Sequence, residues 1–275
     1  MPLVVVGTPI GNLGDLSPRA VEVLATADVI ACEDTRRVRQ LLSHCGIAAR
    51  GRLITANDHN EAAAVRGVPE RLEAGEVVAV MSDAGMPGIS DPGERLVSAA
   101  AAAGHVVQVV PGPCAAVAAL VVSGLPAGRF AFEGFLPRKG KGRAERLDEI
   151  AADRRTTVVY EAPRRVRETV ADLLAACGPL RRVAIARELT KMFEEVWRGT
   201  LDGAVAHVAE TEPRGEYVVV VDGAPERPPA DASEVEAALR QLLAEGADKR
   251  SAVARVAAQL DVPKREVYDV AIRLS

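Results

Sequence analysis

Near its start the chain reads Val4-Val5-Val6-Gly7-Thr8-Pro9-Ile10-Gly11-Asn12-Leu13-Gly14-Asp15-Leu16-Ser17-Pro18. A short apolar strand passes into a glycine-rich loop, and Ser17-Pro18 is a favourable N-cap and first-turn pair for a helix. This order is typical of a ligand loop at the carboxyl end of the first strand of an α/β sheet. The glycine spacing is not G-x-G-x-x-G, and no P-loop lysine follows. Because Pro9 has no backbone N–H to donate, the loop suits close approach to a ligand rather than binding of a diphosphate, with a plain tight turn as the alternative.

Strands and helices alternate over the following hundred residues. The near-continuous apolar character of the strands favours a parallel sheet covered on both faces, in a doubly wound domain. In Asp91-Pro92-Gly93-Glu94 the order of residues predicts a capping box, with Asp91 as N-cap. The expected strands are Leu3–Val6, Asp28–Cys32, Arg52–Thr55, Val77–Met81 and Val106–Val110, and the expected helices are Ser17–Thr26, Thr35–Cys45, Asn60–Ala74 and Asp91–Ala103.

The pattern changes near Ser123-Gly124-Leu125-Pro126. Neighbouring strand signals around Arg187 and Trp197, with no long helix between them, indicate a mixed sheet. The fold class is therefore α/β, with two α/β domains and a small helical segment. The expected boundaries are 1–122 for the first domain, 123–222 for the second, 223–232 for a linker rich in proline, and 233–275 for a tail of three helices. The expected elements of the second domain are strands at Phe130–Phe135, Thr156–Tyr160, Val183–Arg187, Val196–Leu201 and Tyr217–Val221, and helices at Arg143–Ala152, Arg164–Cys177 and Asp202–Glu210.

Composition excludes several classes of protein. Of the 275 residues 48% are hydrophobic, but no run of about 18 apolar residues is present, so no transmembrane helix is expected. The start of the chain lacks the charge and apolar regions of a signal peptide, and a cytoplasmic location is expected. The four cysteines and four histidines are scattered without ligand spacing, which favours core thiols over a metal site.

Cations gather locally although the net charge is −4. Arg138, Lys139, Lys141 and Arg143 are separated by glycines in what reads as a flexible loop after Phe135-Leu136-Pro137. A solvated loop is the simpler interpretation. Four cations in one loop would also contact several phosphates, each of which adds to a salt-dependent affinity.

Polar residues and glycines follow most strands of the first domain, at the edge where ligands bind in open parallel sheets. The loop Ser82–Gly93 is the richest, and Asp83 is expected to accept hydrogen bonds from a ligand while Met86 and Ile89 flank a ring. Asp91 is expected only to cap the next helix. The other strand ends are Glu33-Asp34-Thr35-Arg36, Asn57-Asp58-His59-Asn60, Pro111-Gly112-Pro113-Cys114, Tyr160-Glu161-Ala162-Pro163-Arg164-Arg165 and Arg187-Glu188-Leu189-Thr190-Lys191. Such ends on both domains predict a cleft between them.

Seven of these segments, in this order, resemble the tetrapyrrole-methylase-like (class III) S-adenosylmethionine-dependent methyltransferases. Within that family they are similar to the ribosomal RNA small subunit methyltransferase I group. The segments are Val6–Ser17, Glu33–Arg36, Ser82–Gly93, Val110–Pro113, Phe132–Pro137, Tyr160–Arg165 and Arg187–Lys191. Each string is weak alone, but the resemblance covers about residues 3–222. One departure is Ala162-Pro163-Arg164-Arg165, where relatives often have Pro-His-Arg.

The resemblance implies S-adenosylmethionine as cofactor, bound between two α/β domains, usually in a homodimer with no membrane contact. It also implies 2′-O-methylation of a cytidine ribose in small-subunit (16S) ribosomal RNA, free or in the 30S subunit. Carried over by motif, the cofactor-binding residues are Pro9, Ile10, Asp83, Ala84, Gly85, Met86, Ile89, Ser90, Cys114, Ala115, Tyr160, Glu161, Ala162 and Leu189. The resemblance also implies cofactor contacts from the approach to the strand at Tyr217.

The remaining roles stay open among several residues. Catalytic candidates are Asp34, Glu161, Glu188 and Lys191, and the expected RNA-binding cations are Arg36, Arg138, Lys139, Lys141, Arg143 and Arg164. A tetrapyrrole or other small-molecule methylase is the nearest alternative, although such a substrate requires neither the basic loop nor the helical tail. A ligand-sensing regulator with a helix-turn-helix in the tail is a second alternative.

Overall fold

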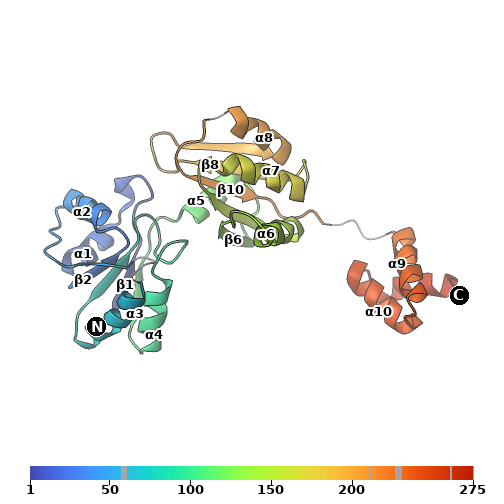
Figure 1. The fold of residues 1–275 in the computed structure, drawn as a ribbon, viewed down its shortest axis with the longest axis horizontal. Coiled ribbons are helices and arrows are strands. Elements are labelled where there is room, and N and C mark those ends of the chain that lie inside the picture. The colour runs from blue at the N-terminus through green and yellow to red at the C-terminus, as the bar shows by residue number, and fades with distance from the viewer. Residues whose placement is uncertain (57–60, 211, 227–230, 261, 275) are drawn as a thin grey trace. The chain divides into compact units, whose positions relative to one another are not determined.

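The fold is known from a computed structural model that describes residues 1–56, 61–210, 212–226, 231–260 and 262–274. The polar segment Asn57-Asp58-His59-Asn60, singled out in the sequence, lies outside the described residues. The chain forms two compact units, Met1–Ala224 and Pro225–Ser275. The first unit holds two five-stranded sheets, and the second holds three helices (Figure 1).

The first sheet is wholly parallel, with strand order β3-β2-β4-β1-β5. β1 lies between β4 and β5, so that Val4 is in register with Ala79 on one side and Gln108 on the other. Every predicted strand is present, within one residue at each end. The elements are β1 Leu3–Val6, η1 Leu13–Asp15, α1 Pro18–Thr26, β2 Val29–Cys32, α2 Thr35–His44, β3 Leu53–Thr55, α3 Glu61–Glu73, β4 Val78–Met81, α4 Glu94–Ala102 and β5 Val107–Val110.

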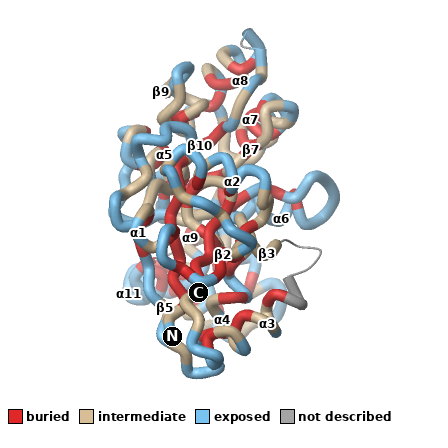
Figure 2. The backbone as a smooth tube through the Cα atoms, turned by 90° about the vertical axis from the view of Figure 1, so that its left-hand side faces the viewer, coloured by how far each residue is buried: buried red, intermediate tan, exposed pale blue. Residues whose placement is uncertain are grey.

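Alternating strand residues bury the two faces of this sheet. Val4 and Ile30 pack with Leu24 of α1 and Leu42 of α2, whereas Leu3 and Val78 belong to the core on the opposite face. That second core includes Leu72 of α3 and Leu96 of α4. Because both faces are covered, the strands need apolar residues at every position, and β1, β2 and β4 are buried along their whole length (Figure 2).

In this region one helix begins later than predicted, and another helix was not predicted. The helix expected from Asp91 begins at Glu94, and its N-cap is Gly93, which has φ +132° and makes no side-chain capping bond. Only glycine adopts that backbone readily, so the tight loop moves the cap two residues along the chain and releases Asp91 from capping. Helix α5, Ala115–Ser123, was not predicted because it is apolar on all sides and has no helical period.

The second sheet is mixed, as predicted, with strand order β6-β7-β10-β8-β9. β6 and β7 are parallel, and the other pairs are antiparallel. Helix α5 covers one face of the sheet, and α6, α7 and α8 contribute to the core on the other. The elements are β6 Phe130–Phe135, α6 Lys141–Ala152, β7 Thr156–Glu161, α7 Val166–Cys177, β8 Arg182–Arg187, β9 Glu195–Thr200, α8 Leu201–Glu210 and β10 Tyr217–Val221.

The second unit consists of α9 (Ala232–Ala244), α10 (Lys249–Leu260) and α11 (Lys264–Arg273). A capping box between Asp231 and Glu234 begins α9. The second unit has a small hydrophobic core of its own, which includes Leu239, Val256 and Val267. All three predicted tail helices are therefore present. Nowhere in the described chain is a helix long and apolar enough to span a bilayer.

Candidate functional site

A cavity of about 350 Å³ lies in the first unit, where loops from both sheets meet. The loops after β1 and β4 and the start of α5 form one side, and the ends of β6 and β7 with the start of β10 form the other. The antiparallel pairing of Tyr217 with Glu161 brings the start of β10 beside the end of β7. The lining residues are Ile10, Ala84, Gly85, Met86, Ile89, Ser90, Asp91, Cys114, Ala115, Phe135, Tyr160, Glu161, Ala162, Pro163, Glu216, Tyr217 and Val218.

Close backbone contacts hold the loops of the first sheet together. Thr8 and Gly85 exchange two backbone hydrogen bonds of 2.9 and 3.1 Å. Gly7 and Gly112 approach so closely that a Cβ atom on either would lie 2.6–2.7 Å from backbone atoms of the other. The loops after β1, β4 and β5 therefore form one rigid wall of the cavity.

The second sheet is tied to the glycine-rich loop through the β8–β9 turn. The backbone N–H of Asn12 donates to the Thr190 hydroxyl at 3.2 Å, and Gly11 has room for no side chain beside Lys191. Glu188 and Thr190 both have positive φ values, of 52° and 66°, which non-glycine residues adopt rarely. This strained turn therefore lies against the loop after β1.

Tyr160 forms part of the cavity's apolar wall. Its ring meets Phe132 and Phe135 edge-on, with centroids 4.9 and 5.8 Å apart. Its hydroxyl oxygen accepts the N–H of Ala116 at 3.0 Å. Burial raises the pKa of this phenol, so Tyr160 stays protonated and acts by packing and hydrogen bonding rather than as a base.

Three carboxyl groups line the cavity, and they differ in their partners. Glu161 is 2% exposed and accepts hydrogen bonds from Thr169 (2.6 Å) and its neighbour's N–H (2.8 Å). Glu216 is largely exposed and pairs with Lys191 at 2.8 Å. Asp91 is half-buried, and burial, with the nearby carboxylate of Glu33 as the next cause, raises its pKa to about 6.

Eleven of the fourteen predicted cofactor-binding residues line this cavity together. The three exceptions are Pro9, Asp83 and Leu189. Leu189 is 8% exposed and packs in the core beneath the second sheet. Pro9 and Asp83 line a second hollow beside α2, where the Asp83 carboxylate accepts the N–H of Asp34 at 3.1 Å and lies 3.4 Å from Arg37. The eleven are Ile10, Ala84, Gly85, Met86, Ile89, Ser90, Cys114, Ala115, Tyr160, Glu161 and Ala162.

Among the catalytic candidates only Glu161 lines the cavity. Asp34 is the N-cap of α2, and its hydrogen bonds with Arg36 lower the pKa of its carboxyl to about 2. Burial alone would raise the pKa of Glu188, but hydrogen bonds from Lys191 and the Glu216 N–H outweigh it and lower that pKa. Burial would lower the pKa of Lys191, but its bonds to the two glutamates raise it. These pairs are therefore poor proton acceptors at neutral pH.

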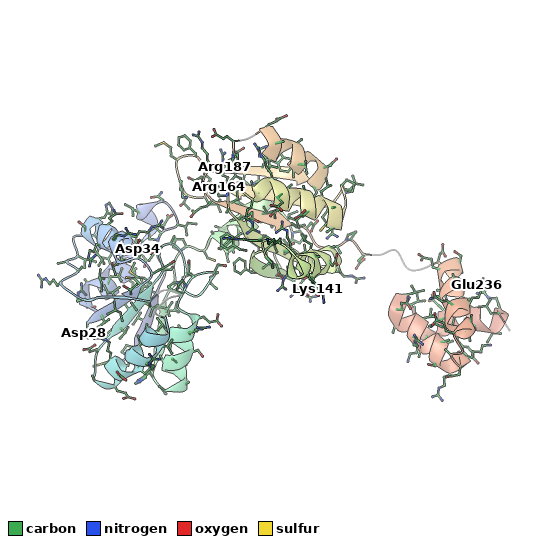
Figure 3. All side chains as sticks on the ribbon, viewed as in Figure 1. Asp28, Asp34, Lys141, Arg164, Arg187 and Glu236 are labelled. Carbon is green, nitrogen blue, oxygen red and sulfur yellow. The ribbon has the colours of Figure 1, made fainter. Side chains whose placement is uncertain are left out.

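The basic segment, residues 138–143, differs from the predicted flexible loop. Lys141 already belongs to α6, and Arg143 is buried there, with hydrogen bonds to Asp172 (2.8 Å), Thr169 (3.0 Å) and the Pro137 carbonyl (2.9 Å). The expectation of a free Arg143 was wrong because its guanidinium joins α6 to α7. The other five predicted RNA-binding cations, Arg36, Arg138, Lys139, Lys141 and Arg164, are exposed (Figure 3 labels Lys141 and Arg164).

Six lining residues are not among the fourteen cofactor-binding residues that were predicted by number. Asp91 was predicted to cap a helix. The many glycines and prolines around it were the feature of the sequence that could have indicated a ligand site there. Phe135 and Pro163 belong to two of the motifs that carry the resemblance, so those motifs could have indicated them. Glu216, Tyr217 and Val218 carry no motif of their own. The resemblance had pointed to the approach to the Tyr217 strand, and the pairing of β10 with β7 brings these residues to the cavity.

The fold is that of known methylases. The family model of tetrapyrrole (corrin/porphyrin) methylases matches residues 2–205. The methyltransferase CobJ has a similar structure, with a TM-score of 0.59, 23% identity and coverage of 83% of this chain and 96% of that one. A uroporphyrin-III C-methyltransferase from Thermus thermophilus, solved with S-adenosyl homocysteine, has a TM-score of 0.55 and 22% identity, covering 80% and 96% of the two chains. The class of protein is therefore a methylase of this fold.

Comparison with individual sequences narrows the class. A protein of Synechocystis sp. named ribosomal RNA small subunit methyltransferase I is 44% identical over 274 residues, which are 99% of this chain and 98% of that protein. The Mycobacterium tuberculosis protein of the same name is 46% identical over 267 residues, 97% and 93% of the two chains. The chain belongs to the ribosomal RNA small subunit methyltransferase I family.

Proposed function

We propose that this protein transfers a methyl group from S-adenosylmethionine to the 2′-hydroxyl of a cytidine ribose in small-subunit ribosomal RNA. The cavity that gathers eleven motif residues from both sheets is the observation that carries the proposal. The relatives' name supports ribosomal RNA of the small subunit as substrate. The cytidine and the 2′-oxygen come from the sequence resemblance, and ribosomal RNA as substrate implies action in the cytoplasm.

The residues of the cavity fit the methyl donor. Ile10, Met86 and Ile89 offer apolar surface for an adenine ring, and Glu216 offers a carboxylate to a ligand that carries a sulfonium and an ammonium group. When bound, the donor supplies an electrophilic methyl group. The protein then has to hold the ribose oxygen in line with that carbon, and such positioning supplies roughly 7–11 kcal/mol of a reaction barrier.

Exposed cations support RNA as the acceptor. Arg138 and Lys139 precede α6 and Lys141 begins it, while Arg164 follows β7 close to the cavity residues Ala162 and Pro163. Arg36 adds a cation on the first sheet's side, where it pairs with Asp34 (Figure 3 labels Asp34). A tetrapyrrole acceptor would need none of these cations.

The resemblance also implies a homodimer, and we include a second copy of the chain in the proposal.

The direct test is methyl transfer to small ribosomal subunits from a strain that lacks this protein. With radiolabelled S-adenosylmethionine as donor, label is expected in RNA and, after digestion, in 2′-O-methylcytidine. Label in a different nucleoside would refute the cytidine assignment. Absence of RNA labelling by protein that binds the donor in calorimetry would favour a small-molecule acceptor instead.

Neutralising the three exposed cations of the basic segment is expected to weaken RNA binding but not donor binding. In the variant with Arg138, Lys139 and Lys141 replaced by glutamine, three phosphate contacts are lost, so the slope of log affinity against log salt should fall by about 2. Filter binding over a salt series measures the slope. The exposed Arg66 on α3, replaced by glutamine, is the control and should leave it unchanged. An unaltered slope in the triple variant would remove this segment from the RNA surface.

A further inference from the structure

Asp91 is the lining carboxylate that the described structure leaves without a cationic partner. It follows Ser90, whose φ of 59° turns the backbone sharply just before it, and it is freed from α4 because Gly93 takes the N-cap position. Glu161, by contrast, accepts a hydrogen bond on each carboxylate oxygen and lies 3.5 Å from Arg165, and Glu216 pairs with Lys191. A carboxylate in a ligand cavity with no cationic partner is available to a substrate.

We infer that Asp91 is the general base of the reaction and accepts the proton of the target ribose hydroxyl. The inference rests on the proposed function and adds the group that activates the acceptor. As the 2′-oxygen forms its bond to the methyl carbon, the carbon–sulfur bond breaks and its electron pair stays on sulfur, leaving a neutral thioether. The hydroxyl proton passes to the Asp91 carboxylate. Atoms and charge balance without any further reactant.

The surroundings of Asp91 suit this role. The Ser82 hydroxyl lies close to the carboxyl, while Glu33 after β2, Asp83 after β4 and Glu216 before β10 surround it with negative charge. Tyr160 of β7 faces it as a neutral phenol. Burial and these carboxylates raise the pKa of Asp91 to about 6, close enough to neutral for an efficient base that is still ionised at pH 7.

The test compares the wild type with Asp91→Asn, which keeps the size and the hydrogen-bonding capacity of the side chain. Single-turnover methyl transfer to the small subunit is expected to fall about 10²–10⁴-fold. The donor Kd, measured by calorimetry, should change less than about threefold, because the base acts on the acceptor. The exposed Glu22→Gln on α1 is the control and should behave as the wild type.

The pH dependence supplies a second criterion. The wild-type rate should rise with pH and level off above an apparent pKa near 6, because only the carboxylate accepts the proton, and this limb should be absent in Asp91→Asn. The Asp91 carboxyl carbon, assigned by the variant, should titrate with the same midpoint in ¹³C NMR without substrate. A wild-type rate in Asp91→Asn, or a loss explained by weaker donor binding, would overturn the inference. Inactive wild-type enzyme would refute the proposed function itself, and the base with it.

Discussion

Replacing Gly112 with alanine is expected to destabilise the protein by about 1–3 kcal/mol and to reduce methyl transfer about 10²-fold. The added Cβ would lie 2.7 Å from the Gly7 carbonyl carbon and 2.8 Å from its Cα. Backbone atoms cannot rotate away as a side chain can, so the loops after β1 and β5 have to separate. Because Ile10 lies in the first of these loops and Cys114 and Ala115 follow the second, the cavity wall moves with them.

Urea unfolding and the rate of methyl transfer to the small ribosomal subunit measure the two effects of Gly112→Ala. Gly128→Ala is the matched control, since an added Cβ there meets nothing within 4 Å and the backbone is not left-handed. Wild-type stability together with a wild-type rate of methyl transfer in Gly112→Ala would show that the two loops are not a rigid part of the site.

Replacing Arg143 with alanine is expected to lower the free energy of unfolding by roughly 2–4 kcal/mol. The side chain is 7% exposed and bridges the Pro137 carbonyl, Asp172 and Thr169, so its removal leaves the buried Thr169 hydroxyl and the partly buried Asp172 carboxylate without this donor. Thr169 in turn donates to Glu161 in the cavity wall, so the change should also weaken donor binding. A lysine at this position cannot form all three bonds from one planar group and should recover only part of the stability.

Chemical unfolding of Arg143→Ala beside Lys139→Ala separates the two kinds of cation in this segment. Lys139 is exposed, and its loss should leave stability within about 0.5 kcal/mol of the wild type while weakening RNA binding. If Arg143→Ala unfolded at the wild-type urea concentration and bound RNA less tightly, Arg143 would belong to the RNA surface after all.

The sequence by itself determined the elements and the class of protein. Apolar runs such as Val78–Met81 and the glycines and prolines between them place every strand within one residue, because burial on both faces requires apolar side chains at each position. The ordered motifs also identified the methylase family and eleven residues of one cavity, since parallel strands bring their carboxyl ends to the same edge. Helix α5 was not predicted, because a segment that is apolar at nearly every position lacks the helical period from which a buried face is recognised.

Only the tertiary structure decided which partner each polar side chain takes. Asp91 appears in the sequence as a helix cap, and Arg143 as a loop cation. Gly93, with its left-handed φ, takes over the cap, and α7 supplies Asp172 and Thr169 to the guanidinium. Glu216 reaches the cavity through the antiparallel pairing of β10 with β7. Such pairings join residues far apart in the chain, so local sequence patterns, which report burial and turns, do not contain them.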